Sequence, residues 1–208
     1  MRKGITILFL FICTFTLHAQ ETVISFDKMN ILYIGIDNPI EFAFDKLDCK
    51  NYKLISTEIS IKCNDSCKCM ATCKSQGYAT VLVADKDNVV IDTVNFITRM
   101  IPNPWIDING MQGGRLNVSD IKTFKELSLK YDFFYFDAGF TITSFDLFWQ
   151  PKNEIPHLIH NKGSIFNKDA LKAISKASPG DIYYFEEIKV LGPDNMTRKL
   201  PGIAFKVE

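Results

Sequence analysis

The chain has 208 residues, with 24 basic and 24 acidic side chains and 47% hydrophobic residues. This composition indicates a folded protein with room for one large or two small domains. The charges balance and are scattered along the sequence, which argues against a nucleic-acid partner or a membrane-binding basic surface.

Residues 1–19 are typical of a secretory signal peptide. Arg2 and Lys3 form a basic start, residues 5–17 form a short apolar run, and Leu17-His18-Ala19 offers a cleavage site before Gln20. The apolar run is too short for a stable membrane anchor, and no later segment is apolar enough to span a membrane. We therefore expect an exported, soluble protein, in the periplasm or beyond. Losing two basic residues leaves 22 against 24 acidic ones, a net charge near −2.

The N-terminal half is rich in strand signals. Short β-prone runs at 23–26, 32–36, 41–44, 54–61, 78–84 and 89–98 are separated by polar turns. The runs on either side of Asp85-Lys86-Asp87-Asn88 predict a hairpin with a four-residue loop. We expect an immunoglobulin-like β-sandwich over residues 20–100, although the Cys…Trp…Cys pattern of antibody domains is absent.

A second β-rich domain is expected over residues 101–208. Pro102 and Pro104 stiffen a connector at 100–104, because neither fits inside a central strand or helix. A short helix with Ser119 as a candidate N-cap is expected within 118–130, and Ala138-Gly139 predicts a bulge or a bend. A helix is predicted at 167–177 behind Asn167, with last strands at 183–190 and 203–207. The aromatic stretch 133–149 predicts a sheet core made of Phe134, Phe136, Phe140, Ile142, Phe145 and Leu147.

Five cysteines follow the signal, and four of them cluster with the spacing C-x3-C-x-C-x3-C. They are Cys63, Cys67, Cys69 and Cys73. Export favours disulfides, and a hairpin through the cluster would place Cys63 opposite Cys73. Zinc or copper binding by the thiolates, and redox catalysis, are the alternatives, but a Cys-x2-Cys unit is missing. The odd count leaves the fate of Cys49 open. Cys13 lies in the signal, without the small preceding residues of a lipoprotein.

Other polar groups predict no site. His157 and His160 are expected in a surface loop beside Pro156, and His18 is lost with the signal. The segment at Asp85 to Asn88 lacks the central glycine and closing glutamate of a calcium loop. Catalytic serine, nucleotide-binding and phosphate-loop patterns are absent from the sequence. We therefore predict no catalytic residue, no metal and no cofactor.

The strongest indication of function is a resemblance. Lys28 to Ile40 reads KMNILYIGIDNPI, an alternating strand that runs into a turn. Further matches follow in order: Arg99, Pro102 and Pro104; the glycine turn 110–114; Phe136-Asp137-Ala138 with 142–145; 178–181; 183–189; 192–194; 198–200; and 205–206. Together they resemble the C-terminal periplasmic domains of the GldM (PorM-like) family over residues 23–208.

The resemblance implies a non-enzymatic part in gliding motility and type IX secretion, with other envelope proteins as partners and with homodimerisation. Members of that family begin with an inner-membrane helix, whereas this sequence begins with the predicted signal peptide. The cysteine cluster is also foreign to the family pattern. A periplasmic metal- or thiol-handling protein using Cys63, Cys67, Cys69 and Cys73 is the alternative function.

Overall fold

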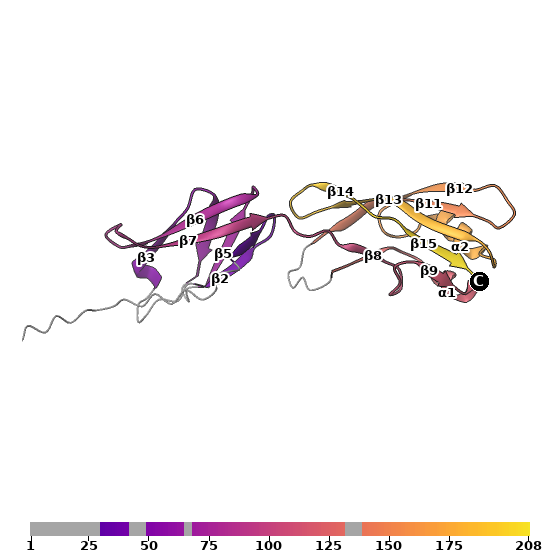
Figure 1. Ribbon diagram of the computed structural model, residues 1–208, viewed down its shortest axis with the longest axis horizontal. Coiled ribbons are helices and arrows are strands. Elements are labelled where there is room, and N and C mark those ends of the chain that lie inside the picture. Colours follow the sequence, from indigo (N-terminus) through magenta and orange to yellow (C-terminus); the bar gives the residue numbers. More distant parts are fainter. Residues whose placement is uncertain (1–29, 42–48, 65–67, 132–138) are drawn as a thin grey trace, which may run out of the picture.

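The computed structural model describes residues 30–41, 49–64, 68–131 and 139–208. Its sheets form two β-rich units that lie end to end, joined by the chain after β7 (Figure 1). Each unit has its own hydrophobic core: one cluster ends at Phe96 and the other begins at Ile106. We call the units the N-terminal sandwich and the C-terminal sandwich.

Two sheets face each other in the N-terminal sandwich. One has the order β1-β7-β6-β3, and the other has the order β2-β5-β4. Leu32, Val81 and Phe96 from the first sheet pack with Ile59 and Ala71 from the second. The bounds are β1 Ile31–Tyr33, β2 Asn38–Glu41, β3 Tyr52–Ile55, β4 Ile59–Cys63, β5 Lys68–Cys73, β6 Gly77–Asp85 and β7 Val90–Arg99, with a 3-10 turn at Cys49–Asn51.

The predicted β6–β7 hairpin is confirmed by its antiparallel register. The run predicted as one strand at 54–61 is instead divided between β3 and β4. Ser56 Oγ accepts hydrogen bonds from the backbone N–H groups of Glu58 and Ile59, at 3.3 and 3.4 Å. Such local bonds compete with a sheet ladder, so the chain turns there and passes from one sheet to the other. Residues 23–26 and 42–44 lie outside the described residues.

The C-terminal sandwich is built on a six-stranded sheet. Its order is β12-β11-β13-β15-β9, with β14 also paired to β13, and β8 pairs separately with β10. The bounds are β8 Trp105–Asp107, β9 Gly114–Leu116, α1 Val118–Ile121, β10 Ser128–Lys130, β11 Thr141–Gln150, β12 His157–Lys162, α2 Lys168–Ser175, β13 Ile182–Leu191, β14 Thr197–Leu200 and β15 Ile203–Val207. The helices and the β8 strand cover the inner face of this sheet.

The predicted helix at 167–177 is confirmed as α2. Asn167 caps it, because its side chain accepts a hydrogen bond from the Ala170 N–H at 2.9 Å. The shorter helix α1 is capped by Asn117 with Asp120 as its capping-box partner, so the prediction of Ser119 as its cap is wrong.

The aromatic core prediction holds for its described members. Ile142, Phe145 and Leu147 are buried, and Phe140 packs against the same core. Register shifts between Ile142 and Asp146 place both Ile142 and Phe145 on the inner face. These shifts lie outside the Ala138-Gly139 pair, where Gly139 has φ +57° and the expected bulge or bend stays a prediction. Phe134, Phe136 and Ala138 are outside the described residues.

Candidate functional site

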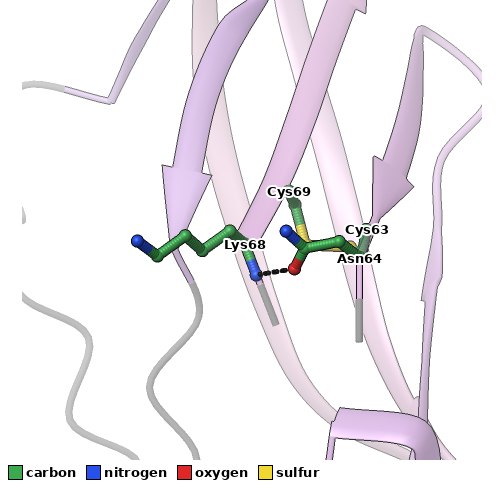
Figure 2. Close-up of a disulfide and its surroundings, with 4 residues drawn as sticks. All are labelled: Cys63, Asn64, Lys68 and Cys69. Atoms are coloured by element: carbon green, nitrogen blue, oxygen red, sulfur yellow. Dashed lines mark hydrogen bonds between the residues drawn. A yellow bond between two sulfur atoms is a disulfide. The ribbon is translucent and has the colours of Figure 1, made fainter. Parts of the chain in front are cut away.

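The cysteine cluster forms a disulfide at the end of the β4–β5 hairpin. Cys63 and Cys69 are paired in the ladder with their Cα atoms 3.9 Å apart, and their sulfurs are bonded (Figure 2). Beside them, the Asn64 side-chain oxygen accepts a hydrogen bond from the Lys68 N–H at 3.0 Å. The disulfide bond closes the end of the β4–β5 hairpin, so the two cysteines have a structural role.

The expectation that Cys63 lies opposite Cys73 is wrong. The register pairs Cys73 with Ile59, so the turn is centred closer to Cys63 than the symmetric spacing suggests. Cys73 is a buried free thiol whose pKa is raised by burial. The Cys63–Cys69 bond uses two of the four thiolates that the alternative metal site would need. Cys67 lies outside the described residues, and Cys49 falls in the 3-10 turn.

The two histidines lie in strand β12, so their placement in a loop is wrong. His157 stacks on Trp149 with ring centroids 5.0 Å apart, and His160 Nδ1 lies 2.7 Å from Asp146 Oδ1. An odd separation along a strand places them on opposite faces. They therefore cannot bind one ion together.

The buried carboxylates of the C-terminal sandwich hold backbone turns. Asp107 accepts hydrogen bonds from the Gly110 N–H and the Ser128 hydroxyl, at 3.0 and 3.1 Å. Asp181 accepts from the N–H groups of Lys152 and Ser178, at 3.0 and 3.1 Å. Both carboxylates are satisfied by these hydrogen bonds, and this accounts for their burial.

The Asp85 turn is likewise structural. One Asp85 oxygen accepts hydrogen bonds from the N–H groups of Asp87 and Val89, each at 2.9 Å. This is the side-chain turn typical of an aspartate opening a hairpin loop.

The described residues contain neither a cluster of metal ligands nor a membrane-spanning helix. Across the described ranges, no three His, Cys, Asp or Glu side chains gather closely enough to hold a metal ion. Over the same ranges, neither the length nor the apolar character of any helix suffices to cross a membrane.

The sequence motif of the resemblance forms a tight turn after β1. Asn38 is buried and its side chain accepts from the Tyr33 N–H at 2.7 Å and donates to the Tyr33 carbonyl at 2.9 Å. The same amide donates to the carbonyls of Ile36 and Ala71, each at 3.1 Å. Gly35 has φ +84°, a conformation that glycine adopts without strain. The motif is therefore a folding element, and its asparagine is the central residue.

An exposed apolar surface accompanies the edge strand β12, which pairs only with β11 in the described sheet. Ile155, Leu158 and Ile165 are 77%, 54% and 69% exposed. Leu158 begins a row of apolar side chains that crosses the sheet. Its register partner Phe148 is next to it, and Tyr184 is next to Phe148; both are half-buried. We call Leu158, Phe148 and Tyr184, which are register neighbours on one face of the sheet, the β12 surface. An open edge beside apolar side chains is typical of a protein-binding surface.

Taken together, these features define a tandem β-sandwich protein whose described polar clusters serve structure. A family model described as the GldM C-terminal domain matches residues 102–208. The match covers just over half of the chain, and the chain belongs to this family. The resemblance stated from the sequence is thereby confirmed for the C-terminal sandwich, and the family associates the protein with gliding and type IX secretion.

Three solved structures show a distant similarity to this chain. Fibronectin(III)-like modules of Clostridium thermocellum CbhA share 11% identity over 86% of this chain and 90% of theirs, with a TM-score of 0.25. The Yersinia pseudotuberculosis adhesin InvE shares 8% identity over 85% of this chain and 56% of its own chain, with a TM-score of 0.27. Chicken VE-cadherin EC1-2 shares 12% identity over 86% of this chain and 96% of its own chain, with a TM-score of 0.24. These scores carry no conclusion about function. No curated protein matches the chain.

Proposed function

We propose that the protein is a non-enzymatic assembly component of a type IX secretion or gliding complex, acting in the periplasm through protein–protein contacts. The family match over residues 102–208 is the observation that carries this proposal. The signal peptide at 1–19 and the division into domains at 20–100 and 101–208 belong to the same proposal. They describe an exported chain whose two sandwiches present surfaces to other envelope proteins.

The β12 surface is the proposed contact for those partners. An edge strand can accept a further strand, whose backbone supplies affinity while side-chain contacts supply specificity. Asn167 Nδ2 donates to the His160 carbonyl at 2.8 Å, which covers the C-terminal part of this edge. Strand addition is therefore expected at the first half of β12, from His157 to Ile159, beside the exposed Leu158.

Deletion of the gene, followed by complementation, tests the proposal. The unaltered protein should restore secretion and gliding, whereas Leu158→Lys should fail because a charge replaces an apolar contact. Val89→Lys is the matched control, since Val89 is 59% exposed on the β6–β7 loop of the other sandwich. Normal secretion and motility in the deletion strain, or full rescue by Leu158→Lys, would contradict the assignment.

Homodimerisation is a further proposal that rests on the family alone. Light scattering on the purified protein distinguishes a mass of 23.7 kDa, less the signal peptide, from twice that value. A monomer at all concentrations would remove homodimerisation from the account and leave the partner proposal intact.

A further inference from the structure

The turn after β1 touches the C-terminal sandwich. A Cβ atom placed on Gly35 would lie 2.6 Å from the Asp194 nitrogen and 2.7 Å from the Pro193 carbonyl carbon. Both neighbours are backbone atoms of the loop between β13 and β14, so they cannot move aside as a flexible side chain would. The two sandwiches therefore approach each other at a point where only glycine fits.

Arg198 fastens the connecting chain to the same loop. One terminal nitrogen donates to the Ile101 carbonyl at 2.8 Å and to the Asn103 side-chain oxygen at 3.1 Å. The other forms an ion pair with Asp194, and these two side chains are 10% and 3% exposed. A largely buried arginine with several fixed acceptors holds its neighbours in one geometry, because its planar group donates in set directions.

Two further contacts complete the connection. The guanidinium of Arg198 lies over the Phe140 ring, 4.8 Å from its centre. At the other end, the Ile34 N–H donates to the Arg99 carbonyl at 2.9 Å, which ties the turn after β1 to the last residue of β7. Ile101, between these anchors, is 2% exposed. The connector is thus held from both sides.

We propose that the Ile34–Asn38 turn is a docking surface for the 192–196 loop, and that Arg198 locks residues 101–103 so that both sandwiches move as one rigid body. Relative motion is the ordinary expectation for domains joined by a short connector with a small contact. Here the glycine contact, the buried ion pair and the anchored connector all act at one place. This inference concerns the molecule alone and does not depend on the proposed function.

Residual dipolar couplings of the purified protein test the docking directly. Couplings from both sandwiches should fit one alignment tensor, with the relative orientation seen in the structure. Two tensors of different magnitude would mean that the sandwiches move independently, and that result would overturn the proposal without any variant.

A matched pair of glycine variants then locates the contact. Gly35→Ala should lose the common tensor, because the added methyl group cannot coexist with the backbone of Asp194. Gly110→Ala is the control, since Gly110 has φ +86° against +84° at Gly35 but has open space around its Cβ position. The two glycines have nearly the same positive φ, so the alanine variants are matched in that respect, and only the variant at the docked glycine should uncouple the sandwiches. A Gly35→Ala protein that keeps the common tensor and orientation would contradict the assignment.

Discussion

The Asn38 side-chain nitrogen lies 3.1 Å from the carbonyl oxygen of Ala71, a residue in β5 that is 33 positions further along the chain. The same nitrogen donates to two carbonyls of its own turn, and the oxygen of the same amide accepts from Tyr33. One buried amide therefore closes the turn after β1 and fixes that turn to the second sheet of the N-terminal sandwich.

Replacing this amide by a carboxylate should be strongly destabilising. Asn38→Asp keeps the shape but places an acceptor against three carbonyl oxygens, and we expect a loss of about 3 kcal/mol in the free energy of unfolding. Chemical denaturation of the purified variant measures it. Asp37→Asn is the control, because Asp37 is exposed in the same turn, and it should change stability little. Equal stability of Asn38→Asp and the unaltered protein would show that the amide network is unimportant.

Tyr183 connects β13 to helix α2. Its buried hydroxyl donates to the Ala173 carbonyl at 2.9 Å, and burial, with the Asp181 charge adding to it, raises the Tyr183 pKa. Tyr183→Phe should lower the free energy of unfolding by about 1 kcal/mol, since it removes one buried hydrogen bond, while the Ala173 carbonyl keeps the Lys176 N–H as a donor at 3.2 Å. Tyr78→Phe, at a residue 83% exposed, is the control and should have no measurable effect in thermal unfolding.

Local chemistry explains which elements could be predicted. Helix α2 has its cap, apolar face and terminating residues within one short stretch, and the β6–β7 hairpin has its turn residues between two β-prone runs. In both cases the deciding interactions join residues close in sequence.

Other features depend on distant contacts and could not be predicted in this way. The partner of Cys63 is set by the strand register, which symmetric spacing does not determine. The approach of Gly35 to Asp194 joins opposite ends of the sequence. The exposure of Leu158 follows from β12 being an edge strand, a fact of topology.

The disulfide assignment leads to a chemical prediction. Trypsin cleaves after Lys62, Lys68 and Lys74, so the non-reduced digest should contain residues 63–68 linked to 69–74. Fragmentation should place the bond between Cys63 and Cys69. Before unfolding, Cys73 should resist alkylation at neutral pH because its thiol is buried with a raised pKa. A Cys63–Cys73 bond, or rapid native labelling of Cys73, would contradict the structure.

Glu58 predicts a pH dependence of stability. Hydrogen bonds from the Thr57 side chain and then the Ser56 side chain lower its pKa from 4.5 to about 2. A carboxyl group whose pKa is lower in the folded state stabilises the fold above its unfolded pKa and loses that contribution as the pH falls. The stability difference between the unaltered protein and Glu58→Gln should therefore be constant above about pH 5 and should shrink between pH 4.5 and 2. A difference that stays unchanged across this range would contradict the assignment.

Photocrosslinking in living cells tests the central claim most directly. A photoreactive amino acid at position 158 should capture ring or motor proteins of the type IX secretion system, identified by mass spectrometry. The same amino acid at position 89, exposed on the other sandwich, should not capture them. Recovery of those proteins from position 158 alone is the predicted result, because the β12 surface is the proposed contact. Recovery of none of them from either position would contradict a role in that assembly.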